Sequence, residues 1–301
     1  MSFLGLLIDV LGPVVLVVAA GAIIGPRLRL DIGTLSRVAF WVLGPCFVFD
    51  LFVTTELAGG TAARLAIAGL AGMAAAIIAV ALVGPPVGIR RSRLRASMMT
   101  GAYGNVGNAG LAIVVFAMGE SARASAGVLM LTISVTGIAL GVGLASAGSA
   151  SLLTALRRAL LAPMPVAAMV AMAVNAVNVE VPLVAGRAAG LLADAMIPLM
   201  LFTLGLQLVE AGGVRLSVPV MVSAGAKLVV APIAAAAVAI ALGLRGDDLA
   251  AVVLQSAMPP AVFCVLVALE FDLERTLVTE SVVVTTVLSL LTLPVALALV
   301  T

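Results

Sequence analysis

Charged residues are scarce in this sequence. Asp, Glu, Lys and Arg make up 10% of the 301 residues, whereas hydrophobic residues make up 63%. A soluble domain has about 25% charged and roughly 45–50% apolar residues, because it must cover its core with polar surface. The composition therefore excludes a water-soluble globule, a disordered chain and a fibrous repeat. No stretch remains for a sizeable soluble domain, which argues against a soluble enzyme or a nucleic-acid-binding protein.

Histidine is missing altogether, and cysteine is rare. The two cysteines, Cys46 and Cys264, each lie inside an apolar run. Histidine is the usual proton-transfer group near neutral pH and the commonest metal ligand, and cysteine in apolar surroundings acts as a small hydrophobe. The sequence also has no phosphate-binding loop. We therefore expect no cofactor, no metal site and no direct use of ATP. An intramembrane enzyme would need a nucleophile with a base or a metal cluster, and the sequence offers neither.

Long apolar segments take the place of these groups. About 190 apolar residues, at roughly 20 per membrane-spanning helix, allow nine or ten spans. Short connections and segment lengths near 20 residues favour helices over the shorter, alternating strands of a membrane barrel. We predict an all-α membrane protein. The predicted transmembrane helices are residues 6–24, 33–54, 62–83, 96–118, 124–146, 159–178, 188–209, 216–242, 248–269 and 276–299.

Arginine sets the expected orientation. The loops after helices 1, 3, 5, 7 and 9 carry ten arginines, and those after helices 2, 4, 6 and 8 carry four. Cytoplasmic loops are enriched in basic residues, so we expect both termini outside the cell (inner) membrane. Residues 1–8 carry no Lys or Arg, which argues against a cleaved signal peptide. The cluster Arg90–Arg95 indicates a topology anchor, with lipid head-group binding as the alternative.

Proline positions indicate an internal repeat. Pro45 and Pro198 are 198 − 45 = 153 residues apart, and the same offset from Asn105 leads to Met258. Transporters often contain two copies of one unit in opposite orientation. With five helices in each half, the second half would be inverted relative to the first. The predicted domains are the repeats 1–150 and 151–301.

Two predicted helices contain residues that weaken a helix at mid-membrane depth. Residues 101–110 hold four glycines and two asparagines, and Pro259 and Pro260 lie inside the ninth helix. Interrupted backbone persists in a membrane only where protein or a water-filled cavity satisfies it. The alternative is close helix packing by the glycines and a simple kink at the prolines. Because both interruptions lie at matched places in the two halves and both segments carry polar amides, we favour a binding site, and its half-helix N-termini would suit an anion. Its predicted substrate-binding residues are Tyr103, Gly104, Asn105, Gly107, Asn108, Gln255, Met258, Pro259 and Pro260.

Ionisable residues inside the spans are functional candidates. Lys227 lies near the middle of the eighth helix, and it would either hold an anionic substrate or form a structural ion pair. Asp50 and Asp194 are candidate charge partners or proton carriers, although both lie toward helix ends. Hydroxyl groups of the fifth helix would either face the broken helices or bond their own backbone. They are Thr132, Ser134 and Thr136.

Several short motifs together resemble the auxin efflux carrier family, the bacterial relatives of the plant PIN carriers in the wider bile-acid/arsenite/riboflavin transporter superfamily. The similarity covers nearly the whole chain and rests on order and spacing. The motifs are Gly104–Gly110 (GNVGNAG), Pro198–Leu208 (PLMLFTLGLQL), Lys227–Pro232 (KLVVAP), Gln255–Pro259 (QSAMP) and Leu288–Pro294 (LSLLTLP).

This resemblance implies a ten-helix carrier in which helices 4 and 9 cross at the substrate site. Helices 1, 2, 6 and 7 would form a scaffold, and helices 3–5 and 8–10 would move against it like an elevator. The implied substrates are small organic anions, namely auxin or carboxylates such as malate. Membrane lipid is an expected partner, the coupling ion would be a proton or sodium, and a homodimer is left open. The plant carriers have proline in helix 4 as well, whereas this helix 4 has none.

Two rival functions remain. A sodium-coupled symporter of the bile-acid type would use a carboxylate in helix 9, where this sequence has Gln255. Amide and backbone oxygens can bind sodium, but a site without a carboxylate binds a cation more weakly, so we favour a carrier without sodium coupling. A channel is the other alternative, and single-channel currents would distinguish it.

Overall fold

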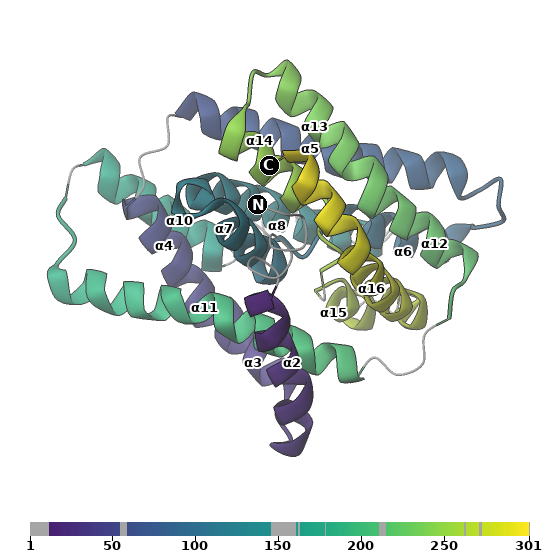
Figure 1. Ribbon diagram of the computed structural model, residues 1–301, viewed down its shortest axis with the longest axis horizontal. Helices are drawn as coiled ribbons and strands as arrows, with labels where there is room; N and C mark the ends of the chain where they lie inside the picture. The colour runs from purple at the N-terminus through teal and green to yellow at the C-terminus, as the bar shows by residue number, and fades with distance from the viewer. Residues whose placement is uncertain are drawn as a thin grey trace. The chain divides into compact units, whose positions relative to one another are not determined.

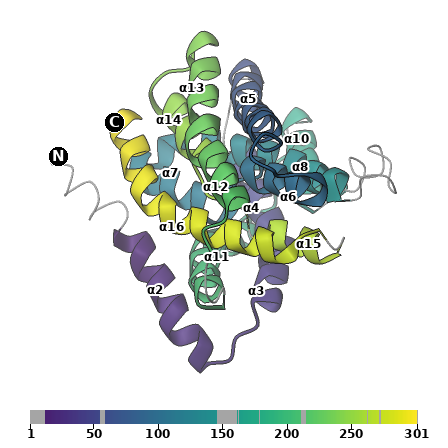
Figure 2. The same ribbon diagram turned by 90° about the vertical axis from the view of Figure 1, so that its right-hand side faces the viewer.

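Helices make up the described structure. The computed structural model describes residues 12–54, 59–145, 161, 163–177, 179–210, 215–261, 263–270 and 273–300, and within these ranges it contains no β-strand (Figures 1 and 2). The helices form two compact units, each made from two separate parts of the chain.

In the first unit, the described residues form the α-helices α2 (Gly12–Arg27), α3 (Ile32–Val38), α4 (Gly44–Thr54), α10 (Pro163–Ala176) and α11 (Leu183–Glu210). The long helix α11 packs against α2 and α4, and α10 packs against α4. Two glycines bring α2 and α11 together. A Cβ atom added at Gly21 would lie 1.9 Å from the Phe202 carbonyl oxygen, and one added at Gly205 would lie 1.9 Å from that of Val18. Only residues without a side chain permit this approach of two backbones.

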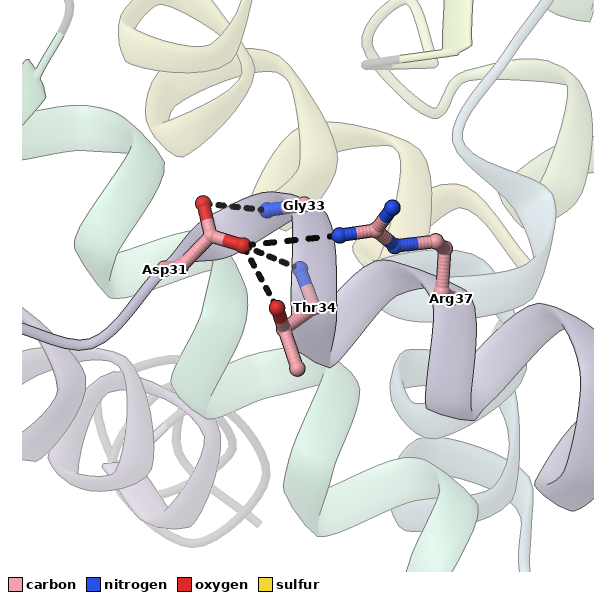
Figure 3. Close-up of polar contacts among 4 residues, drawn as sticks. All are labelled: Asp31, Gly33, Thr34 and Arg37. Atoms are coloured by element: carbon pink, nitrogen blue, oxygen red, sulfur yellow. Dashed lines mark hydrogen bonds and ion pairs between the residues drawn. The ribbon is translucent and has the colours of Figure 1, made fainter.

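Helix α3 begins at a well-formed cap (Figure 3). The Asp31 carboxylate accepts hydrogen bonds from the backbone N–H of Gly33 (3.3 Å), and from the backbone N–H (2.8 Å) and hydroxyl (2.6 Å) of Thr34. Arg37 lies 3.8 Å from the same carboxylate. The hydrogen bonds from Thr34 are the main reason that the pKa of Asp31 is lowered from its ordinary value of 3.8. These contacts satisfy N–H groups that have no partner within the helix.

In the described residues of the second unit, the α-helices are α5 (Gly59–Val83), α6 (Arg91–Ala102), α7 (Leu111–Met118), α8 (Arg123–Ala145), α12 (Val218–Gly225), α13 (Ala231–Ala241), α14 (Gly246–Ser256), α15 (Phe263–Glu270) and α16 (Arg275–Val300). Helix α5 packs against α6, α8 and α13. Ala76, Val80, Ala226 and Ala231 form a small buried cluster there. Small side chains let these helices approach closely, as is typical of helices in a membrane.

Six helical segments among the described residues are long and apolar enough to cross a membrane. They are Ile32–Val53, Gly60–Val83, Glu120–Gly141, Leu183–Leu206, Val218–Ala241 and Arg275–Val300. Two shorter apolar helices are Val15–Arg27 and Pro163–Asn175. The first and sixth predicted spans begin outside the described residues, and all ten predicted segments overlap helices. The predicted boundary near residue 150 also lies outside the described residues, and the inverted repeat stays a prediction.

Proline explains two irregular turns inside the long segments. A π-helical turn, Ala39–Leu43, precedes Pro45, and another, Ala226–Val230, precedes Pro232. In each, the residue before proline donates its N–H five residues back, from Gly44 to Ala39 and from Ala231 to Ala226. Proline lacks an N–H, and its ring clashes with the carbonyl four residues earlier. The wider turn relieves this clash without ending the helix.

Candidate functional site

The first helix interruption lies between α6 and α7. Helix α6 ends at Ala102, and Tyr103 is extended, with φ −86° and ψ 100°. Asn105, with φ −78° and ψ 58°, leads into a π-helical turn that continues into α7. The break falls inside the glycine- and asparagine-rich segment 101–110, where the sequence predicted it. Glycine costs about 1 kcal/mol relative to alanine in a helix interior, and asparagine competes for backbone hydrogen bonds, so an opening here costs least.

The second helix interruption lies between α14 and α15. Helix α14 ends at Ser256, and the chain leaves helical geometry before α15 begins at Phe263. Pro259 and Pro260 lie in this gap. Each proline removes a donor and restricts the residue before it to extended backbone, so two in succession prevent the helix from continuing. This interruption also falls where the sequence predicted it.

The two gaps cross and pair through their backbones. The Asn105 N–H donates to the Pro259 carbonyl over 2.7 Å, and the Ala261 N–H donates to the Tyr103 carbonyl over 2.9 Å. Gly104 and Pro260 therefore face each other as an antiparallel bridge. Interrupted helices in a membrane leave polar backbone groups that must find partners. Here each gap supplies those partners to the other, which fixes the crossing point.

Two glycines of the first gap make room for side chains of the second unit. A Cβ atom added at Gly104 would lie 2.9 Å from Lys227 Nζ, and one added at Gly110 would lie 2.1 Å from Gln255 Oε1. Gln255 is fully buried, and its Nε2 donates to the Ala126 carbonyl over 3.2 Å. Its Oε1 has no hydrogen-bond partner among the described residues. A buried amide oxygen without a partner costs about 1–3 kcal/mol, so this acceptor is available to a ligand.

Lys227 reaches the crossing from the π-helical turn between α12 and α13. Its side chain is 2% exposed, and its Nζ donates to the Ser256 carbonyl over 2.9 Å, at the C-terminal end of α14. That carbonyl is one of the last in α14, where the partial negative charge of the helix end favours a cation. Among the described residues, Lys227 has no carboxylate partner. Asp50 and Asp194 belong to helices α4 and α11 of the first unit, and their predicted roles stay predictions.

Tyr103 is held on the other side of the same gap. Its hydroxyl is hydrogen-bonded to the hydroxyl of Ser134 on α8. Its ring meets that of Phe263 edge-on, with centroids 6.0 Å apart. The ring also lies against Gly137, where an added Cβ would be 2.2 Å from it. The Cys264 thiol lies 4.0 Å from the Tyr103 carbonyl. The ring is thus fixed from two helices, and Ser134 is the predicted α8 hydroxyl that faces the crossing.

The structure gathers most of the predicted site residues at this crossing. Tyr103, Gly104, Asn105, Gln255, Met258, Pro259 and Pro260 are all buried there. Gly107 is half-buried and faces Met130, and the side chain of Asn108 lies outside the described residues. Sequence reasoning missed Ser256, Ala261, Phe263 and Gly137. Only the position of Ser256 and Ala261 beside the prolines could have indicated the first two.

The crossing brings together polar groups of several kinds. The first turn of a helix has N–H groups without a partner inside the helix, and these carry partial positive charge; such a turn begins after Asn105. Lys227 adds an ammonium group, and Asn105 and Gln255 add neutral amides. The described residues contain no group of three or more Cys, Asp or Glu placed to hold a metal ion.

Comparison with known proteins points to transport. The second half of the chain, residues 149–297, matches the family model described as "Membrane transport protein". A relative named "Uncharacterized transporter", from Methanothermobacter thermautotrophicus strain Delta H, is 35% identical over 112 residues. That alignment covers 37% of this chain and 37% of the relative, so it spans little more than a third of either protein. Together with the long apolar helices, the two matches support an integral membrane transporter.

Proposed function

We propose that this protein is a secondary carrier that moves a small organic anion through the crossing of its two interrupted helices. The observation that carries the proposal is the backbone pairing of Gly104 with Pro260, beside the buried side chains of Lys227 and Gln255. Interrupting a helix in its interior costs several kcal/mol. Helices can pack against one another without such an interruption. A helix N-terminus beside an ammonium group is the kind of site that binds a carboxylate.

The division into two units supports movement of an elevator type. The helices of the crossing all belong to the second unit, whereas the closely packed pair α2 and α11 belongs to the first. A carrier of this type moves a substrate-holding body against a fixed one. The matches to transporters support the class of function, and the resemblance to auxin efflux carriers supports auxin or a carboxylate such as malate as substrate.

Uptake into proteoliposomes tests the proposal. The full chain would be reconstituted and given labelled malate and labelled indole-3-acetate in separate assays. We expect saturable uptake of at least one of them, and about a tenfold loss in Asn105→Ala and Pro259→Ala, the scale of one lost transition-state interaction. Pro294→Ala is the matched control, because Pro294 lies inside the continuous helix α16. Normal uptake by Asn105→Ala and Pro259→Ala would overturn the site assignment.

An imposed sodium gradient separates the proposal from sodium coupling. The crossing holds an amide at position 255 and an ammonium at position 227, and a sodium site prefers several oxygen ligands without a neighbouring cation. We therefore expect the same initial rate with and without the gradient. Acceleration by inward sodium would instead favour the symporter of the bile-acid type.

A further inference from the structure

This protein contains one lysine, and that lysine lies at the crossing. Lys227 is the single lysine of the chain, and the other 15 of its 16 basic residues are arginine. Arginine stays charged in any protein environment, whereas a buried lysine can lose its proton. A group that needed only a permanent positive charge would be served by arginine, as everywhere else in the sequence. The residue type therefore singles out position 227 as a place where charge can change.

Within the part of the chain that the structure describes, Lys227 has no permanent counter-charge beside its ammonium. The titratable groups at the crossing are Tyr103 and Cys264, both neutral at neutral pH. The helices that pack against its turn, or that bond it, carry their charged residues only in their first two turns. These are Arg64 on α5, Arg91, Arg93 and Arg95 on α6, Asp247 and Asp248 on α14, and Arg275 and Glu280 on α16. A buried charge without a counter-charge is unfavourable, so an anion bound at the crossing would stabilise the ammonium form.

Buried hydroxyls lie on three helices, α6, α12 and α16, that pack against the π-helical turn carrying Lys227. We name as the hydroxyl seam Ser97 and Thr100 of α6, Ser223 of α12, and Ser281 and Thr285 of α16, all 0% exposed. Helix α12 packs against both α6 and α16, and α6 packs against α16. Ser223 Oγ lies 3.4 Å from Ser281 Oγ, and Ser97 Oγ lies 3.5 Å from the Pro219 carbonyl. Ser223 and Lys227 are four residues apart, so the seam and the lysine lie on related faces of one segment.

One hydroxyl of the seam, and two near it in the sequence of α12 and α14, can accept or donate a further hydrogen bond. Serine and threonine in membrane helices usually bond a carbonyl of the preceding turn, and Thr100 and Ser223 do so. Thr285 Oγ1 of the seam, Ser256 Oγ at the end of α14 and Ser217 Oγ just before α12 are buried and have no hydrogen-bond partner among the described residues. Ser217 precedes α12, ten residues before Lys227, which corresponds to about 15 Å along a helix. That distance is about half of a bilayer's hydrocarbon core of roughly 30 Å.

We propose that Lys227 binds one proton together with each anion that enters the crossing, and that the hydroxyl seam is the path by which this proton arrives from the Ser217 end. The inference rests on the proposed function and specifies its coupling ion. A proton from water at the end of the seam joins the lone pair of the Nζ amine and forms the ammonium. When the anion leaves, the ammonium returns one proton to water. Anion and proton binding favour each other by the same factor, because linkage is reciprocal.

The single lysine makes a direct test feasible. The full chain, with a lysine-free tag, would be grown with ¹⁵N- and ¹³C-labelled lysine and placed in lipid nanodiscs, where one side-chain signal reports the protonation of Nζ. The probes are malate and indole-3-acetate, each titrated with pH and compared with the unliganded protein. We expect the ammonium signal to persist to a pH about one unit higher when a probe is bound, the effect of one opposite charge nearby.

Proton-driven uptake tests the path. In proteoliposomes an imposed pH gradient, acid on the side from which the anion enters, is expected to raise uptake severalfold in the unaltered protein. Thr285→Val keeps the shape of the side chain but removes its hydroxyl, and it is expected to lose most of this stimulation. Thr279→Val is the matched control, because its hydroxyl bonds Arg275 in the first turns of the same helix, away from the seam.

The outcomes separate the two proposals. Failure of both probes to bind or to be transported would overturn the proposed function and this inference with it. Probe binding that leaves the lysine signal unmoved, or uptake that ignores the pH gradient, would overturn the inference alone. Full stimulation in Thr285→Val would overturn the assigned path. None of these readouts requires Lys227 to be replaced, so a folding defect at that position cannot obscure them.

Discussion

Glycine brings two backbones together in two regions of this protein, with different results. Between α2 and α11, Gly21 and Gly205 let continuous helices touch. Between the gaps after α6 and α14, Gly104 faces Pro260 and the backbones exchange hydrogen bonds. In the first region the peptide groups are already paired within their helices, so contact adds packing alone. In the second they are not, so contact must also satisfy polar groups.

The neighbours of glycine decide between these results. Gly21 and Gly205 are flanked by apolar residues that favour helix, whereas Gly104 is followed by Asn105 and crosses a pair of prolines. In a close contact between intact helices, the backbone N–H and carbonyl groups are already paired within each helix. The crossing leaves Gln255 Oε1 without a partner and draws in Lys227 Nζ. A comparison of substitutions in the two regions can separate packing from binding.

The largest effect is expected at Gly110. Gly110→Ala places a Cβ atom 2.1 Å from Gln255 Oε1 and 3.0 Å from Met258 Cγ, which displaces the amide and the chain beside Pro259. A displacement of about 1 Å at a binding site can cost about 100-fold in rate. We expect anion uptake to fall by that order while the protein still folds. Uptake within twofold of normal would show that the Gln255 side chain has no part in transport.

Gly205→Ala should act on stability instead. Its Cβ would lie 1.9 Å from the Val18 carbonyl oxygen, a backbone atom that cannot move alone, so α2 and α11 must separate. Overpacking of this kind costs about 1–3 kcal/mol. Thermal unfolding in detergent should show the loss, with uptake per folded molecule unchanged. Gly186→Ala, on the same helix, meets nothing closer than 3.8 Å and should be neutral or slightly stabilising. Equal effects of the two would contradict the role of close contact.

A pair of amides provides a finer comparison. Gln255 Nε2 donates to the Ala126 carbonyl over 3.2 Å in the second unit, and Asn175 Nδ2 donates to the Phe52 carbonyl over 2.6 Å in the first. Gln255→Leu is expected to lower uptake about tenfold, the scale of one lost binding interaction. Asn175→Leu should leave uptake unchanged and cost about 1 kcal/mol of stability. Uptake assays and thermal unfolding on both variants would check this, and a reversed pattern would place the site elsewhere.

The sequence predicts the helices and their two interruptions because both depend on local chemistry. Apolar segment length and the cost of glycine and proline inside a helix are properties of a few neighbouring residues. It also singles out Lys227 and Gln255 as unusual residues for a membrane interior. It does not predict that Lys227 bonds the Ser256 carbonyl, or that Tyr103 meets Ser134 and Phe263. Those contacts depend on how separate helices pack, and no spacing within one helix encodes them.

The smallest effect is expected at Asp31, which lies outside both contacts and tests an ordinary helix end. Because the folded pKa of Asp31 is lowered from 3.8, its charge stabilises the fold above the ordinary carboxyl range, and that contribution disappears as the pH falls through the folded pKa. Asp31→Ala should therefore lower the melting temperature slightly at pH 7 and equal the unaltered protein in strong acid. Asp31→Asn keeps the capping acceptor and should lose less. The ion pair with Arg37 is exposed and adds little. If the melting temperature of Asp31→Ala stayed below that of the unaltered protein in strong acid, the hydroxyl and backbone contacts at this cap would stabilise α3, and its charge would not.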